Sequence, residues 1–248
     1  MYRNELELYL NQLLDISRFS DYCPNGLQVE GRNEIHTVIS GVTASLEFLE
    51  AAVTANADAL LVHHGYFWRG EDTRLTGIKG RRIALLMKHG INLFAYHLPL
   101  DGHGELGNNV QLGHKLDLIE TSRFGEQDIM MQGKLTQTMT LENFSAKITQ
   151  ALSRKPMIIG ELNKQVQHIA WCTGAAQGYF EEAIRLGVDV FITGEISEQT
   201  VHIARESGVA FIAAGHHATE RYGVQALGKH LEQKFNIKHQ FIDIENPV

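Results

Sequence analysis

The side chains best suited to metal chemistry stand in three short segments of this sequence. A histidine pair, His63 and His64, ends the segment ADALLVHHG; Asp101 ends INLFAYHLPLD; and AGHHATE contains His216 and Glu220. Imidazole and carboxylate without thiolate suit Zn, Mn, Fe, Co or Ni, and geometry rather than composition selects among these metals. Each segment alone has an ordinary structural explanation, but the three together predict a metal site.

The apolar run in front of the histidine pair, residues 59–62, is bounded by Asp58 and Gly65. This pattern predicts a fully buried strand of a mostly parallel sheet. Open α/β sheets bind their ligands beyond the carboxyl ends of such strands. Neighbouring side chains on a strand point to opposite faces, but where the strand ends the two histidines can splay toward two neighbouring ions.

The other two segments supply carboxylates. A helix that begins after Gly215 would put His216 and Glu220 on one face, at i and i+4, whereas His217 would point elsewhere. Asp101 follows a proline in a segment that we expect to be non-helical, from which its carboxylate can turn toward the same cleft.

We expect two ions bridged by Glu220, because the glutamate stem can reach between them. One ion would take His63 or His64 together with Asp101, and the other ion would take the remaining histidine together with His216. Two bridged ions give a water of low pKa as nucleophile and a clamp for a leaving oxygen.

The sequence does not identify the catalytic residue. Glu220 and a water held by the ions are the first candidates, with Glu195 and His97 in supporting positions around the ligands. His97, four residues before Asp101, is also typical of an ordinary hydrogen-bonded histidine. Glu195, in FITGEISE, is equally typical of a charge near a helix N-terminus.

Three further features have both a functional and an ordinary explanation. The basic run within 69–82 could meet a phosphate-bearing substrate, but a solvated face is the commoner reason for such a run. The aromatic residues 66–68 could stack on a base, form an oligomer contact or pack in the core. The turn GAAQG, 174–178, resembles a phosphate-binding turn only loosely and matches neither the dinucleotide fingerprint nor the P-loop.

Strand-like and helix-like segments alternate along the chain, which predicts an α/β fold with parallel pairing. A turn-rich loop is expected over 21–31, and the periodicity weakens over 117–128. The strongest expected elements are helices over 3–15, 45–56, 141–152, 179–187 and 197–207, and strands over 35–42, 188–193 and 209–214.

The two halves of the chain resemble each other in order. Laying the segment from His36 to Gly65 over the segment from Gln167 to Glu195 pairs Asp58 with Asp189, and the histidine pair falls opposite Gly194 and Glu195. Further on, His97 and Asp101 mirror His216 and Glu220. We therefore predict two similar α/β domains from an internal duplication, residues 1–122 with the His-His and Asp ligands and residues 123–248 with the GHHATE ligands, facing one another across the metal site.

Composition excludes several function classes. The formal net charge is −7 at pH 7, so the chain has no global electrostatic reason to bind nucleic acid or an anionic membrane. No apolar run approaches the roughly 18 residues of a membrane helix, and the N-terminal segment lacks the core of a signal peptide. With only two cysteines among 248 residues, no disulfide framework is expected, and the cytoplasm is the expected compartment.

Seven segments together resemble a known family. PNGLQVEG, GVTAS, VHHGYFW, HLPLD with GNN after it, WCTG, DVFITGE and AGHHATER are similar to the NIF-three-like proteins of the short bacterial, YbgI-type form, often labelled GTP cyclohydrolase 1 type 2 homolog. The resemblance implies two similar α/β domains with a dinuclear metal centre in the cleft between them, and a homohexameric, ring-shaped toroid. It implies metal ligands at His63, His64, Asp101, His216 and Glu220.

Three functions are compatible with these features. The first is a metal-dependent hydrolase, cyclohydrolase-like or acting on a phosphate ester, with two divalent transition-metal ions per subunit and a small phosphate- or purine-bearing substrate. The second is a non-enzymatic hexameric metalloprotein that binds nucleic acid or a protein partner in a DNA-damage or regulatory role; net charge does not favour nucleic acid, and only residues 69–82 offer a basic patch. The third is metal storage or chaperoning.

Overall fold

The computed structural model describes residues 1–248, which form two compact units. The first unit comprises Met1–Gly107 and Gly223–Glu245, and the second comprises Asn108–Tyr222 and Asn246–Val248. The predicted single boundary between 122 and 123 falls inside a strand of the second sheet, so the units are not consecutive halves of the chain. No helix combines the length and the apolar character needed to cross a bilayer.

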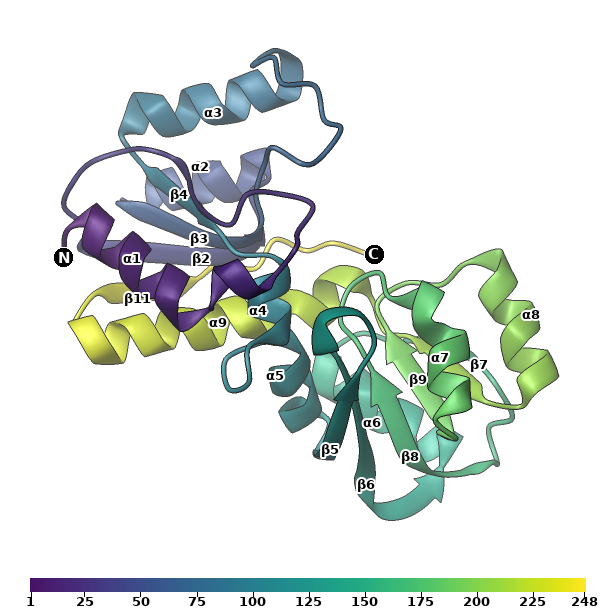
Figure 1. Ribbon diagram of the computed structural model, residues 1–248. Helices are drawn as coiled ribbons and strands as arrows, with labels where there is room; N and C mark the ends of the chain where they lie inside the picture. Colours follow the sequence, from purple (N-terminus) through teal and green to yellow (C-terminus); the bar gives the residue numbers. More distant parts are fainter. The chain divides into compact units, whose positions relative to one another are not determined.

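The first unit is a five-stranded sheet with helices on both faces (Figure 1). The strand order is β1-β4-β3-β2-β11; β2, β3, β4 and β11 are parallel, and β1 is antiparallel to β4. Its elements are α1 (Arg3–Leu13), η1 (Ile16–Arg18), β1 (Gly26–Val29), β2 (Thr37–Thr43), α2 (Leu46–Thr54), β3 (Ala59–His64), α3 (Gly77–His89), β4 (Asn92–Ala95), α4 (Leu98–Gly102) and β11 (Lys238–Phe241).

Alternate residues of the first sheet enter two separate cores, as the period of two along a strand requires. Leu60 and Val62 of β3 pack with α2 and α3, whereas Ala59 and Leu61 pack with α1 and with the part of α9 (His216–Phe235) that belongs to this unit. Both cores are apolar and fully enclosed, so β3 is held rigidly up to its carboxyl end. This is the strand that ends in His63 and His64.

The second unit contains a six-stranded sheet in the order β5-β6-β8-β9-β10-β7 (Figure 1). Strands β8, β9 and β10 are parallel, and β5, β6 and β7 are paired antiparallel. Its elements are α5 (Asn108–Lys115), β5 (Leu118–Phe124), η2 (Glu126–Asp128), β6 (Met130–Thr140), α6 (Leu141–Leu152), β7 (Met157–Ile159), β8 (Gln165–Trp171), η3 (Gln177–Tyr179), α7 (Phe180–Arg185), β9 (Val190–Thr193), α8 (Glu198–Ser207), β10 (Ala210–Ala213) and the first turns of α9.

The second sheet also has a helix layer on each face. Helices α5 and α6 pack on one face against Ile169, Ile192 and Ile212, one residue from each parallel strand. On the other face Phe180 at the start of α7 meets Phe191 and Phe211, with ring centroids 6.0 and 5.0 Å apart. The carboxyl ends of β9 and β10 are thereby fixed side by side.

Most expected elements are present, and three details differ. The loop expected over 21–31 contains the short strand β1, and the weak stretch 117–128 contains β5, which pairs with β6. Helix α6 spans residues 141–152 as predicted, with the Thr140 hydroxyl accepting from Asn143 N. The segment around Asp101, expected to be non-helical, is the short helix α4, because proline is tolerated in the first turn of a helix.

Candidate metal centre

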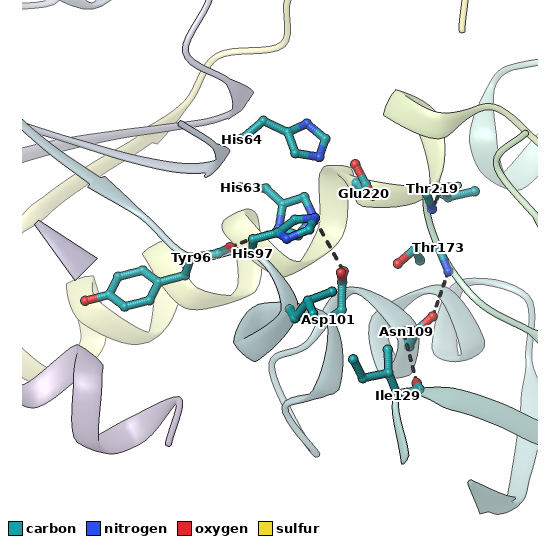
Figure 2. Close-up of polar contacts among 12 residues, drawn as sticks. His63, His64, Tyr96, His97, Asp101, Asn109, Ile129, Thr173, Thr219 and Glu220 are labelled. Atoms are coloured by element: carbon teal, nitrogen blue, oxygen red, sulfur yellow. Dashed lines mark hydrogen bonds and ion pairs between the residues drawn. The ribbon is translucent and has the colours of Figure 1, made fainter. Parts of the chain in front are cut away.

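Three histidines of the first unit converge at the carboxyl ends of β3 and β4 (Figure 2). His63 and His64 end β3, and His97 follows β4 as the residue before α4. The ligand atoms of the three imidazoles all lie within 4.8 Å of one another. The His63 and His64 rings splay by 48°, with centroids 4.6 Å apart, so neighbouring residues of one strand both reach this place.

Each of the two strand-end histidines has its Nδ1 beside an oxygen. His63 is completely buried, and its Nδ1 donates to the Tyr96 carbonyl over 2.9 Å. A carbonyl only accepts, so Nδ1 holds the proton and Nε2 is the ligand atom of the neutral ring. His64 Nδ1 lies 3.1 Å from the Thr43 hydroxyl. Metal-ligating histidines are held in this way, because the partner oxygen fixes both the tautomer and the ring orientation.

His97 is held by a carboxylate. Its Nδ1 lies 2.7 Å from Oδ1 of Asp21, and the other oxygen of Asp21 accepts from Leu98 N and from the Asn25 side chain. Burial would raise the pKa of Asp21, but these hydrogen bonds and the charge of His97 lower it to about 2. Asp21 is therefore a permanent carboxylate at neutral pH, and the turn-rich PNG loop serves to place it.

Cys23 lies in the same loop, and its Sγ forms a group with the ligand atoms of Asp21 and His97, all within 4.8 Å of one another. Burial, with the negative charge of Asp21, raises the pKa of its thiol to about 12. The thiolate is the metal-binding form of cysteine. In the metal-free fold Cys23 is therefore a protonated thiol.

Asp101 reaches the same cluster from α4. Its Oδ1 lies 3.6 Å from Nε2 of His63, the atom expected to bind metal (Figure 2). Backbone N–H groups of Leu100 and Asp101 both donate to the His97 carbonyl, which closes the first turn of α4. A short helix rather than an irregular segment thus points the Asp101 carboxylate at His63.

The second unit presents one histidine between two carboxylates. His216, the first residue of α9, has Nδ1 2.7 Å from Oε1 of Glu195 and Nε2 3.2 Å from Oε2 of Glu220. The predicted i and i+4 spacing thus brings His216 and Glu220 together on one face of the helix. Burial would lower the pKa of His216, but Glu220 and Glu195 raise it to about 9. His217, predicted to point elsewhere, belongs to none of the His/Cys/Asp/Glu groups that could hold a metal ion.

The turn after β8 is shaped around Glu220. Gly174 has a φ of +69°, and a Cβ at this position would lie 2.3 Å from Oε1 of Glu220. Its N–H donates to the Thr219 hydroxyl, and Ala176 N donates to the Thr193 hydroxyl. These amides already donate to side chains of the same unit. The GAAQG turn therefore packs against Glu220 and does not offer these N–H groups to a phosphate.

The GNN segment fastens the strand that leads into this turn. The Asn109 amide donates to the Ile129 carbonyl, and its side-chain oxygen accepts from Thr173 N over 2.8 Å (Figure 2). The Asn109 carbonyl in turn accepts from the Trp171 indole. One asparagine therefore fixes the end of β8 next to Gly174.

The basic run is largely paired within the first unit. Arg74 forms an ion pair with Asp72 at 2.7 Å, and Lys79 with Glu71 at 3.4 Å. Arg69 donates to the Asp21 carbonyl. Three of the five basic side chains of this run are thus engaged within the first unit.

The aromatic residues after the histidine pair divide between core and site. Tyr66 is buried and donates to the Ala44 carbonyl over 2.7 Å, so it belongs to the core. Trp68 instead lies edge-on to His97, with ring centroids 5.0 Å apart, and 6.0 Å from His64. It shields the histidine cluster from one side.

Sequence reasoning did not find Asp21, whose carboxylate holds His97. His97 was expected behind Asp101, but its ligand atom lies with those of His63 and His64. Asp21 precedes the first predicted strand by more than ten residues, and no helix or strand period connects it with His97. The available signal was the turn chemistry of the DYCPNG segment, which implied a loop with a fixed shape.

Comparisons with known proteins agree with this architecture. Residues 1–247 match the model of the DUF34/NIF3 family (NGG1p interacting factor 3), and the chain belongs to this family. It is 51% identical to a protein of Allochromatium vinosum and 52% identical to one of Pseudomonas aeruginosa, both called GTP cyclohydrolase 1 type 2 homolog. These alignments cover 98% and 96% of this chain, and 96% and 95% of the relatives. The family resemblance drawn from the sequence motifs is confirmed.

Solved structures show the same fold over the whole chain. The structure described as protein ybgI, unknown function, has a TM-score of 0.96 at 45% identity, with 100% of both chains covered. The structure of TTHA1606 from Thermus thermophilus has a TM-score of 0.91 at 34% identity, again with 100% of both chains covered. The two-sheet α/β architecture predicted from the sequence is thus confirmed.

The donor set fits a divalent transition metal. All four histidines of the two clusters have Nδ1 against an oxygen: a carbonyl, a hydroxyl and two carboxylates. This arrangement presents Nε2 in each case, and the carboxylates of Asp101 and Glu220 lie beside two of these atoms. Neutral imidazole with carboxylate suits the metals that the sequence indicated.

Proposed function

We propose that this protein is a dinuclear metal-dependent hydrolase that acts on a small phosphate- or purine-bearing substrate. The observation that supports it best is the oxygen partner behind every histidine of the two clusters. Structural histidines need no such uniform orientation, whereas ligating histidines do.

The proposed ligands are His63, His64 and Asp101 of the first unit, with His216 and Glu220 of the second. The second unit alone offers one imidazole and one carboxylate, fewer than the three protein ligands usual at a catalytic zinc ion. Asp101 and Glu220 lie close in sequence to the two points where the chain passes between the units, after Gly107 and after Tyr222. We therefore propose one shared centre with Glu220 as the bridging ligand.

Divalent ions at this centre would act as Lewis acids that activate water and stabilise a departing oxygen. The chain's own residues orient the histidine rings and shield them from bulk water. Glu195 holds His216 in one orientation, and Asp21 does the same for His97. Trp68 limits the access of bulk water to these rings.

The substrate class follows from the names of relatives. Proteins about half identical to this chain are called GTP cyclohydrolase 1 type 2 homolog, so GTP is the first substrate to test, followed by other nucleotides and phosphate esters. Binding of two metals would also be compatible with a partner-binding metalloprotein, which the same experiment separates from an enzyme.

The test compares metal-loaded wild type with Glu220→Gln in product assays by chromatography. We expect turnover in the wild type and at least about a hundredfold loss in the variant, because a ligand carboxylate is neutralised. Glu206→Gln, a substitution of an exposed glutamate on α8, is the matched control and should retain full activity. A wild type that holds metal but converts no substrate would contradict the hydrolase and favour the partner-binding metalloprotein.

We also propose a homohexamer, as the family resemblance implies. Native mass spectrometry of the metal-loaded protein tests it directly. A mass of six chains is the expected result, and a monomer at micromolar concentration would contradict it.

A further inference from the structure

A second feature of the second unit lies at the same edge of its sheet as His216. A pocket of about 640 Å³ opens at the carboxyl ends of β9 and β10, where the residues that follow Thr193 and the last residue of β10, Ala213, line it. Ligands of open α/β sheets bind at this edge, and the volume falls in the range of small-molecule sites. We call it the Arg154 pocket; its lining residues are Arg154, Lys155, Pro156, Met157, Gly194, Glu195, Ile196, Ala213, Pro247 and Val248.

Two neighbouring cations lie in the wall of this pocket. Arg154 and Lys155 follow α6, whose C-cap residue Ser153 has the left-handed conformation. Arg154 is held in place, because its guanidinium donates to the Pro247 carbonyl over 2.6 Å and packs against the Cα of Gly215. Neither cation forms an ion pair with an acidic side chain, and Glu195 is the one acidic side chain among the lining residues.

The pocket and the metal-binding side chains share a residue. Glu195 lines the pocket with its neighbours Gly194 and Ile196, and its Oε1 accepts from His216 Nδ1 at 2.7 Å. A molecule in the pocket therefore lies one side chain away from His216. The carboxylate of Glu195 is itself engaged by the imidazole, which reduces its repulsion of an anion nearby.

Another pocket of the same unit lacks these properties. It is lined by Ile158, Gly160, Glu161, Lys164 and Arg205, among others, and includes Gly208, which precedes β10. It therefore lies at the amino end of β10, opposite the edge where His216 stands. Lys164 is already bonded, since its ammonium donates to the Gly208 carbonyl over 2.7 Å.

We propose that the Arg154 pocket binds the phosphate of a small molecule of nucleotide size, with Arg154 and Lys155 as its specificity-determining residues. The proposal rests on the proposed function, because it gives the substrate of that centre its phosphate contact. Arg154 suits this role, since a fixed guanidinium forms two parallel hydrogen bonds to phosphate oxygens, and Lys155 adds a mobile point charge. The remainder of the molecule would extend past Glu195 toward His216.

The test uses chelator-treated, metal-free full-length protein and inorganic pyrophosphate as the probe, measured by calorimetry at physiological ionic strength. The double variant Arg154→Gln/Lys155→Gln should bind pyrophosphate at least about tenfold more weakly than the wild type, because charge-assisted contacts are lost. The control Lys134→Gln/Arg185→Gln removes the same charges from exposed positions of the same unit and should bind like the wild type. Should the double variant fail to fold by circular dichroism, Lys155→Glu at its exposed position provides the same test, with at least about a tenfold loss expected.

Equal affinity in wild type and Arg154→Gln/Lys155→Gln would overturn the proposal, as would a metal-free wild type that binds no pyrophosphate. Binding that appears only after metal loading and ignores Arg154 would overturn the pocket while leaving the metal centre intact. Binding that depends on Arg154 in a protein unable to take up metal would support the pocket and contradict the proposed hydrolase.

Discussion

The two units of this chain share one plan and differ at their strand ends. In the first sheet, β1-β4-β3-β2 repeats the order β7-β10-β9-β8 of the second, and in both the edge strand is antiparallel and the other three are parallel. A helix precedes each edge strand, α1 in one unit and α6 in the other. The order of elements supports the internal duplication.

One aspartate performs the same task in both units. Asp58 accepts from the backbone N–H groups of His36 and Thr37 at 2.8 and 2.9 Å, and Asp189 accepts from those of Gln167 and His168 at 2.9 and 2.8 Å. In each case the aspartate directly precedes a central strand and fastens it to the start of its neighbour. The pairing of Asp58 with Asp189 in the sequence overlay therefore has a physical basis.

The chemistry diverges where the strands end. The register that equates Asp58 with Asp189 puts His63 and His64 opposite Gly194 and Glu195. One unit thus provides imidazoles at this position, and the other provides an acid that supports an imidazole from α9. A duplicated scaffold with unlike ends supplies both ligand types that a mixed imidazole and carboxylate centre requires.

The repeated His-x-x-x-acid pattern is displaced by one residue between the two units. Tyr96 N bonds to Val62 and Ala214 N bonds to Thr193, so strand register equates His97 with Gly215 rather than with His216. The predicted mirror between the two His-to-acid pairs was therefore wrong by one position. The extra residue in the second unit allows His216 to begin α9, whereas His97 stays outside α4 and is held by Asp21.

The largest predicted effect is a difference in the free energy of unfolding between substitutions of Asp58 and of Asp189. Asp58 is also ion-paired with Arg32 at 2.7 Å, and its side chain is 10% exposed, against 30% for Asp189. Asp58→Ala should lower the free energy of unfolding by about 3 kcal/mol and Asp189→Ala by about 1 kcal/mol, because unpaired buried amides cost more than solvated ones. Denaturant titration measures both, and equal losses would refute the difference in burial as the cause.

Gly174→Ala should weaken metal binding by about 10- to 100-fold, as is usual when a supporting contact of a ligand is disturbed. The added methyl would collide with the Glu220 carboxylate at 2.3 Å. Gly178→Ala in the same turn meets nothing within 4 Å and is the control. Competitive titration with a metal indicator gives the affinities; unchanged binding in Gly174→Ala would mean that Glu220 is not a ligand.

Glu195→Gln and Asp21→Asn compare the supports of His216 and His97. Loss of a carboxylate behind a ligating histidine typically costs about 10- to 100-fold in metal affinity. We expect this loss in Glu195→Gln and a smaller one, about threefold, in Asp21→Asn, because His97 is not among the proposed ligands. Competitive titration with the metal indicator measures both affinities. A loss in Asp21→Asn as large as that in Glu195→Gln would indicate that His97 is a ligand.

The smallest predicted effect is on the pH dependence of the Tm. Because the pKa of His216 is raised to about 9 in the metal-free fold, its contribution to stability is complete below its ordinary value near 6.5 and disappears as pH rises through about 9. The Tm of metal-free wild type should therefore fall between pH 6.5 and 9 by more than that of His216→Asn. Parallel pH profiles of the two proteins in calorimetry would contradict this.

The sequence predicted the central strands and the approach of His216 to Glu220 through their spacing. Alternating apolar runs identify β3, β9 and β10, and the i, i+4 spacing identifies the pair on α9. The strands β1 and β5 were not predicted, because β1 is only four residues long and β5 exposes most of its side chains. The boundary was misplaced because chain order cannot show that the last helix and β11 return to the first sheet. The support of His97 by Asp21 depends on tertiary contact and has no local signal.

Metal content is the most direct test of the proposal that this chain holds a dinuclear metal centre. Protein purified without added metal should contain about two transition-metal ions per chain by plasma mass spectrometry, and variants that remove ligands from either unit, His64→Ala and Glu220→Ala, should each fall to about one ion or fewer. A wild type that arrives without metal and takes up neither Mn, Fe nor Zn on addition would contradict the account.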